Sequence, residues 1–366
     1  MSGSHGRGCA DCEALPEALP DAGFLHLAAP LSRTGERLRK LLRRSGLEFQ
    51  EAESGVMTVR LPPQGLEKLA LDLAGLLTAG EQLECPCLLS AERGCPGLAE
   101  LLRTQPLSRV VGRVRGEWVR QLLAEQRLVT HFQPIVEARA PERVFAHECL
   151  VRGRERNGAL VTPSEVQRAA RAAGLLSQFD RAARIQAVRS AARRDLPGQV
   201  FVNVNPNAVH DPATCLRTTL DVAAEAGIDH ERMVFEITET EDVADATHLA
   251  KLLAFCRHHG FRVALDDLGA GFSSVRLLRR LKPDFVKLDR ELIEGIDRDA
   301  FKARFVEKLL DVARSLAIPI IAEGVETAQE WRWVEQHEVD YVQGFYVAAP
   351  DDPPRPPRRS SSQRPV

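Results

Sequence analysis

Residues 233–289 read MVFEITETEDVADATHLAKLLAFCRHHGFRVALDDLGAGFSSVRLLRRLKPDFVKLD. Three short apolar runs, at 233–237, 262–266 and 284–288, alternate here with segments whose apolar residues recur at helical spacing. Each run has the length of a single strand. Strands that alternate with helices in this way predict a parallel sheet assembled from strand–helix–strand units.

The same alternation extends in both directions and covers residues 127–349. Five further apolar runs have the length of strands, and they lie at 129–136, 144–151, 200–204, 319–322 and 340–343. Eight strands with helices between them, over about 220 residues, match the size and period of a TIM-like (β/α)8 barrel of the α/β class. An open doubly wound sheet is the alternative, but no Gly-rich dinucleotide fingerprint follows a first strand.

The rest of the chain divides into four shorter segments. Residues 1–22 are rich in small and turn-forming residues, which predicts a flexible N-terminus that contains cysteines. Strand and helix patterns over 23–106 predict a small α+β domain, which we interpret as a sensory or regulatory module that acts on the barrel. Residues 107–126 have the pattern of a linker helix. Residues 350–366, rich in Pro, Arg and Ser, predict a disordered tail.

The composition is that of a globular protein. With 366 residues, 44% of them hydrophobic and 27% charged, the chain is not collagen-like, mucin-like or wholly disordered. The 49 Lys and Arg nearly balance the 51 Asp and Glu, so overall charge gives no reason to expect a DNA or RNA polymer as a partner. No apolar run reaches the roughly 18 residues that span a bilayer, and we see no secretory signal. We therefore expect a cytoplasmic protein without a transmembrane segment.

Polar residues stand late in, or just after, the apolar runs from the second to the eighth. They are Glu148, Asn203, Glu236, Asp266, Asp267, Lys287, Glu323 and Gln343. In a barrel, these strand ends converge on one mouth. A single Glu or Lys at such a position is more often a solvated loop residue, but an ordered set over seven strands indicates a site.

Carboxylates gathered at such a mouth repel one another unless cations neutralise them. Glu, Asp and Asn oxygens without His or Cys favour Mg²⁺ or Mn²⁺ over Zn²⁺. Asp266 and Asp267 could hold one ion each, or one of them could bridge two ions, as in two-metal phosphoryl chemistry. Lys287 would then supply positive charge or a proton near the reacting phosphate.

These residues fall in motifs that resemble those of the EAL-domain family, bacterial phosphodiesterases that act on cyclic di-GMP. The motifs are FQPIV (132–136), ECLVR (148–152), NVN (203–205), EITET (236–240), DDLGAGFSS (266–274), KLD (287–289), AEGVET (322–327) and QGF (343–345). The chain departs from the usual family pattern at Cys149, where alanine is common, and at Leu268, Ala270 and Phe272 in the loop after Asp267.

The resemblance implies a barrel whose first strand runs antiparallel to the others, and hydrolysis of cyclic di-GMP to linear pGpG with two Mg²⁺ or Mn²⁺ ions. It implies metal ligands at Glu148, Asn203, Glu236, Asp266, Asp267 and Glu323. It assigns proton handling to Lys287 and Glu323, substrate contacts to Gln133, Leu150, Arg152 and Gln343, and anchoring of the loop after Asp267 to Glu239. It also implies a homodimer formed through the barrel.

Two other functions remain open at this point. Relatives that have lost metal ligands serve as non-catalytic cyclic di-GMP receptors or protein-interaction scaffolds, but here all the matched positions are retained, which favours the enzyme. An unrelated metal-dependent barrel hydrolase would require the ordered motifs to be coincidental.

Five of the eight cysteines lie in the first 95 residues, at Cys9, Cys12, Cys85, Cys87 and Cys95. In a reducing compartment, thiols or metal ligands are expected more than disulfides. The pairs Cys9-x-x-Cys12 and Cys85-x-Cys87 are unequal, unlike those of a standard zinc ribbon. A structural Zn²⁺ site, redox-sensing thiols and dispersed structural thiols are therefore all compatible with the spacing.

Overall fold

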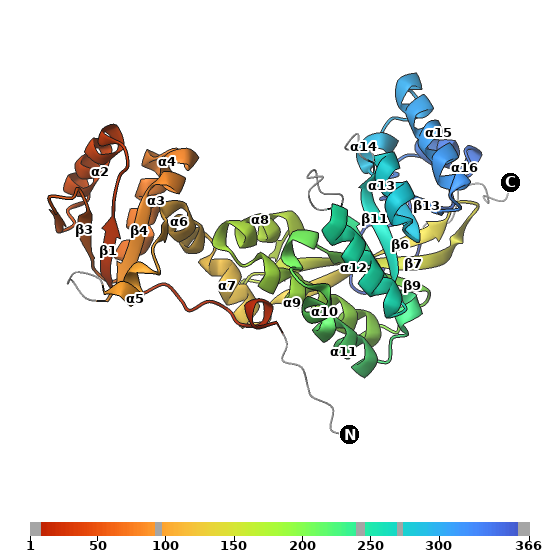
Figure 1. The fold of residues 1–366 in the computed structure, drawn as a ribbon. Helices are drawn as coiled ribbons and strands as arrows, with labels where there is room; N and C mark the ends of the chain where they lie inside the picture. The colour runs from red at the N-terminus through yellow and green to blue at the C-terminus, as the bar shows by residue number, and fades with distance from the viewer. Residues whose placement is uncertain (1–8, 92–96, 239–245, 269–273, 358–366) are drawn as a thin grey trace. The chain divides into compact units, whose positions relative to one another are not determined.

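The computed structural model describes residues 9–91, 97–238, 246–268 and 274–357 (Figure 1). The described residues form two compact units. Unit 1 consists of the described residues in Met1–Glu13, Leu128–Pro163 and Asp180–Val366. Unit 2 consists of the described residues in Ala14–Arg127 and Ser164–Phe179. No helix in the described ranges is long and apolar enough to cross a membrane.

Unit 1 is built on a closed ring of eight strands in the described part of the chain. The strands are β6 (Leu128–Glu137), β7 (Ala140–Arg154), β9 (Gln199–Val204), β10 (Met233–Thr238), β11 (Arg262–Leu268), β12 (Phe285–Leu288), β13 (Ile320–Ala322) and β14 (Tyr341–Val342). Strand β6 pairs antiparallel with both β7 and β14, while the other neighbours in the ring are parallel. The TIM-like barrel with a reversed first strand is thereby confirmed.

Helices flank these strands (Figure 1). They are α9 (Leu176–Arg193), α10 (Pro212–Cys215), α11 (Arg217–Glu225), α12 (Ala246–His258), α13 (Ser274–Leu281), α14 (Arg290–Ile293), α15 (Ala300–Ser315) and α16 (Ala328–Gln336), with 3-10 turns η1 (Pro206–Ala208) and η2 (His230–Arg232). The short strand β8 (Leu160–Val161) pairs antiparallel with β7 outside the ring. Apolar side chains from strands and helices together form the larger core of unit 1.

A second, smaller core belongs to the strands alone. Its members are Ile135, Ala146, Phe201, Val234, Ala264, Phe285 and Ile321, and the rings of Phe145 and Tyr341 pack against it. These residues come one from each of seven strands. Side chains alternate between the two faces of a strand, so residues two positions away share the same face. Residues two positions away from this core on each strand therefore also point into the barrel and form the next layer of side chains.

Unit 2 contains a five-stranded antiparallel sheet in the order β2-β3-β1-β4-β5. The strands are β1 (Gly23–Leu27), β2 (Phe49–Glu51), β3 (Met57–Leu61), β4 (Pro86–Ser90) and β5 (Gln105–Pro106). The helices are α2 (Ser32–Ser45), α3 (Gly65–Leu76), α4 (Ala79–Glu84), α5 (Leu98–Leu101), α6 (Leu107–Arg115), α7 (Glu117–Ala124) and, from a later part of the chain, α8 (Pro163–Ala173). Its core includes Leu25, Leu38 and Leu69, so the predicted small α+β domain has a core of its own.

Three segments differ from the sequence-based expectation. The predicted linker helix over 107–126 is two helices, α6 and α7, and Leu107, Val110 and Val111 of α6 are buried in the core of unit 2. Within the predicted flexible N-terminus, α1 (Ala10–Glu13) forms a helical turn and Cys12 is buried in unit 1. Asp351, in the predicted disordered tail, pairs with Phe132 through two backbone hydrogen bonds. The end of that tail, from residue 358, lies outside the described residues.

Candidate active site

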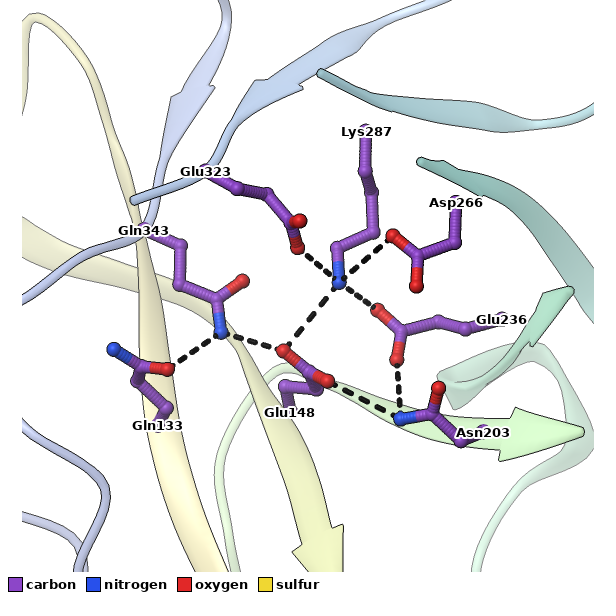
Figure 2. Close-up of polar contacts among 8 residues, drawn as sticks. All are labelled: Gln133, Glu148, Asn203, Glu236, Asp266, Lys287, Glu323 and Gln343. Carbon is purple, nitrogen blue, oxygen red and sulfur yellow. Dashed lines mark hydrogen bonds and ion pairs between the residues drawn. The ribbon is translucent and has the colours of Figure 1, made fainter. Parts of the chain in front are cut away.

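A layer of polar side chains lies next to the apolar layer inside the barrel. Each member lies in a strand or directly after it, two residues from a side chain of the apolar layer, as in the pairs Phe201 and Asn203, or Phe285 and Lys287. In every strand except β6, the polar residue comes two positions after the apolar one. In the reversed strand β6, Gln133 comes two positions before Ile135. The resulting group, called the polar ring below, consists of Gln133, Glu148, Asn203, Glu236, Asp266, Lys287, Glu323 and Gln343 (Figure 2).

Lys287 lies at the centre of the polar ring and is completely buried. Its Nζ is 2.5 Å from Oε1 of Glu236, 3.4 Å from Oε2 of Glu148 and 3.7 Å from Oδ1 of Asp266. It also forms an ion pair with Glu323. Burial alone would lower the pKa of this ammonium, but the surrounding carboxylates outweigh burial and hold its pKa well above the ordinary value. Lys287 therefore stays positively charged at neutral pH.

Amide side chains orient the carboxylates around Lys287. Nδ2 of Asn203 donates to Oε1 of Glu148 at 3.1 Å and to Oε2 of Glu236 at 3.0 Å. Nε2 of Gln343 donates to Oε2 of Glu148 at 2.6 Å and to Oε1 of Gln133 at 3.1 Å. Asn203 is exposed, so the polar ring opens to solvent on its side. Both carboxylate oxygens of Glu148 therefore accept a hydrogen bond, one from Asn203 and the other from Gln343.

The polar ring contains more acidic groups than its single cation can neutralise. If all were ionised, four carboxylates at −1 and one ammonium at +1 would leave a formal charge of −3. Burial, reinforced by the charge of Glu148, raises the pKa of Glu236 well above the ordinary value. Burial likewise raises the pKa of Glu323 to about 8. Without further cations, these two carboxyl groups hold protons that most glutamates lose.

Glu148 behaves differently from its neighbours. Burial opposes its ionisation, but the charge of Lys287 and the hydrogen bonds from Gln343 and Asn203 outweigh burial and lower its pKa. The polar ring is therefore a set of hard oxygen donors with an uncompensated negative charge. Such a donor set, which contains neither His nor Cys, fits Mg²⁺ or Mn²⁺. Oε1 of Gln343 is also buried without a hydrogen-bond partner among the described residues.

Two predicted substrate-contact residues continue along β7 from Glu148. Leu150 and Arg152 are two and four residues further on, on the same face of the strand, and both are partly exposed. Burial lowers the pKa of Arg152, and the charge of Glu148 opposes that shift. The side chain of Asp267, and the whole of Glu239, lie outside the described residues.

Comparison with known proteins assigns the barrel to a family. The family described as "EAL domain" matches residues 116–350, which is more than half of the chain. The chain belongs to the EAL-domain family. The recognition made from the sequence motifs is thereby confirmed, and the match also includes all of α7.

Individual relatives agree with this assignment. A standalone EAL protein from Vibrio cholerae, solved in its c-di-GMP-bound form, is 31% identical and has a TM-score of 0.59, covering 65% of this chain and 98% of that chain. The cyclic di-GMP phosphodiesterase NbdA of Pseudomonas aeruginosa is 28% identical over 355 residues, covering 87% of this chain and 45% of its own. An uncharacterized signaling protein of Caulobacter vibrioides is 31% identical over 233 residues, covering 63% and 28%. The chain spans less than half the length of these two curated relatives.

The described cysteines that the sequence offered as possible metal ligands are divided between the two units. Cys9 and Cys12 lie in unit 1, where their sulfurs meet that of Cys215 from α10 of the EAL barrel. Cys85 and Cys87 are buried in the core of unit 2, and Cys95 lies outside the described residues. The sequence-based reasoning missed Cys215, because it stands outside every motif and 203 residues from Cys12.

The raised pKa of Glu323 predicts a pH-dependent stability of the metal-free protein. Because the folded carboxyl binds its proton more tightly than the unfolded one, its stabilising contribution is complete below the ordinary value of 4.5 and is lost as pH rises through about 8. Glu323→Gln removes this titration. In the presence of a chelator, the free energy of unfolding of the wild type, measured by denaturant titration, should fall relative to that of Glu323→Gln between about pH 5 and 8.5. A difference that stays constant over this range would contradict the assignment.

Proposed function

We propose that this protein hydrolyses cyclic di-GMP to linear pGpG with two Mg²⁺ or Mn²⁺ ions. The observation that carries the proposal is the polar ring, in which four acidic side chains surround Lys287 inside an EAL barrel. Two relatives support the choice of substrate. NbdA is named a cyclic di-GMP phosphodiesterase, and the Vibrio cholerae protein was solved with c-di-GMP bound.

The acidic members of the polar ring would hold the metal ions. We assign Glu148, Asn203, Glu236 and Asp266 to the first ion, and Asp266, Asp267 and Glu323 to the second. Bound in this way, paired divalent cations supply an activated water and charge stabilisation for the leaving oxygen. Loading the site would require Glu236 and Glu323 to lose their protons, since carboxyl groups bind metal in the ionised form.

Lys287 and Glu323 have different parts in the reaction. Lys287 keeps its proton because the carboxylates stabilise the ammonium, so it acts as a fixed positive charge toward the phosphate oxygens rather than as a base. Glu323 contacts Lys287, and we assign to it the transfer of a proton during the reaction. Their ion pair keeps the charge donor and the proton acceptor side by side.

The substrate would extend from the polar ring along β7. Arg152 lies on the same face of the strand as Glu148 and is partly exposed, so its guanidinium can pair with a phosphate oxygen. Leu150, between them on that face, offers an apolar contact to the nucleoside. Gln133 and Gln343, which hydrogen-bond to each other, orient water or substrate beside Glu148.

Replacing Glu148 tests the function directly. Purified protein is incubated with cyclic di-GMP and Mg²⁺ or Mn²⁺, and the nucleotides are resolved by chromatography. The wild type should release pGpG. Glu148→Ala should lower turnover by at least about a hundredfold, because it removes a proposed metal ligand that is held by two amide donors and by Lys287.

The matched control is Cys149→Ala, one residue further along β7 and packed in the larger core of unit 1. It should keep near-normal turnover. A near-normal rate for Glu148→Ala would refute the site assignment. Tight binding of cyclic di-GMP by the wild type without any pGpG would identify a receptor instead of an enzyme.

Replacing Lys287 separates chemistry from binding. Lys287→Met keeps most of the side chain's volume and removes its charge, so we expect kcat to fall by about a hundredfold or more while KM changes little. Steady-state kinetics with saturating Mg²⁺ or Mn²⁺ measure both constants, and circular dichroism checks that the variant is folded. If KM rose steeply at an unchanged kcat, Lys287 would be a substrate-binding residue.

We also propose that unit 2 regulates the barrel and that the protein is a homodimer through the barrel. Unit 2 has a core of its own, so it can be disrupted selectively. Leu38→Asp places a charge in that core, whereas Leu71→Asp, at an exposed leucine of α3, is the matched control. Only Leu38→Asp should change the turnover rate, by about fivefold or more, or change the dimerisation measured by analytical ultracentrifugation. Unchanged rate and oligomeric state would exclude regulation.

A further inference from the structure

Three cysteine sulfurs meet outside the polar ring, where the N-terminal segment reaches the helices of the barrel. Cys9 directly precedes α1, Cys12 lies within it, and Cys215 is the last residue of α10. Sγ of Cys215 is 3.6 Å from Sγ of Cys12 and 3.9 Å from Sγ of Cys9. All three sulfurs lie within 4.8 Å of one another.

These distances are those of a shared metal rather than of a disulfide. Two bonded sulfurs would be about 2.05 Å apart. Tetrahedral Zn²⁺ with Zn–S bonds of about 2.3 Å separates its sulfurs by about 3.8 Å, between the two distances found here. We propose that Cys9, Cys12 and Cys215 bind one Zn²⁺ ion as thiolates.

Backbone hydrogen bonds hold the three cysteines in place. The carbonyl oxygen of Cys9 accepts from the N–H groups of Cys12 at 3.1 Å and Glu13 at 3.0 Å, and this turn brings both sulfurs of the Cys-x-x-Cys pair to one side. The N–H of Cys215 donates to the carbonyl of Asp211 at 2.8 Å. The ligand atoms are therefore positioned by the fold of each segment.

The surroundings fit a charged metal–thiolate group. Arg184 of α9 is 1% exposed, and its guanidinium donates to the carbonyl of Cys215 at 3.3 Å and to Oγ1 of Thr219 at 3.2 Å, while it also pairs with Asp180. Three thiolates and one Zn²⁺ carry a charge of −1, which a neighbouring guanidinium stabilises. Cys9 is only partly buried, so the fourth tetrahedral position is accessible to a water molecule on that side.

A metal at this position would fasten the N-terminal segment to the barrel. Glu13 already accepts from Arg181 and from Oγ1 of Thr218, both at 3.4 Å. The chain passes into unit 2 at Ala14, immediately after this anchor. A soft cation that binds all three sulfurs would therefore cross-link two parts of the sequence that are 203 residues apart.

Metal analysis of the full-length protein tests the site. Protein purified without chelators should contain one Zn²⁺ per chain by inductively coupled plasma mass spectrometry, and a competing chelator titration gives the affinity. Cys9→Ser and Cys215→Ser should each weaken zinc binding by at least about a hundredfold. Cys256→Ser, at another buried cysteine of unit 1, is the matched control, and Cys87→Ser tests the ligand set expected from the sequence; both should keep the zinc.

Co²⁺ absorption distinguishes metal bound by cysteine sulfurs from metal bound by the oxygen ligands of the polar ring. The Co²⁺-loaded protein should show thiolate-to-cobalt charge-transfer absorption in the near ultraviolet, which Cys9→Ser removes and Glu148→Ala keeps. Because Cys9 is only partly buried, its variant stays folded even if Cys215→Ser does not. The proposal is overturned if the wild type binds no zinc, if Cys9→Ser retains it, or if mass spectrometry finds a disulfide among the three cysteines in place of the metal.

Discussion

Charge compensation around Lys287 is the constraint on which the rest of the structure depends. Two like charges about 4 Å apart repel by about 4 kcal/mol at an effective dielectric of 20, a large fraction of the net stability of an ordinary domain. One ammonium contacts all four carboxylates of the polar ring, and burial, together with the charges of the other carboxylates, raises the pKa of Glu236 and Glu323. The same imbalance that destabilises the metal-free protein makes the site attractive to divalent cations.

The apolar layer beside the polar ring strengthens the electrostatic interactions around Lys287. Phe201, Phe285 and their neighbours fill the barrel and exclude water from one side of Lys287. Chemically identical groups differ here, because the charge of Lys287 and two amide donors lower the pKa of Glu148, whereas burial and the charge of Glu148 raise that of Glu236. Two carboxyl groups of one site thus have pKa values that are shifted in opposite directions.

Much of the barrel could be predicted from the sequence because its information is local. Each strand is a short apolar run, and each polar member of the ring interrupts or ends such a run, so period and position alone indicated Glu236, Asp266 and Lys287. The features that escaped prediction depend on long-range burial. Nothing near residue 110 indicates that α6 completes the core of unit 2, and nothing near Cys215 indicates that Cys9 and Cys12 pack against it.

The reversed strand β6 has a consequence for how the protein is made. It lies between β7 and β14. The first barrel strand to leave the ribosome therefore pairs on one side with the last strand to be made. Gln133 and Gln343, hydrogen-bonded across this seam, are 210 residues apart. The ring of strands therefore cannot close until β14 has been synthesised, and until then the carboxylates at the strand ends lack their partners across this seam.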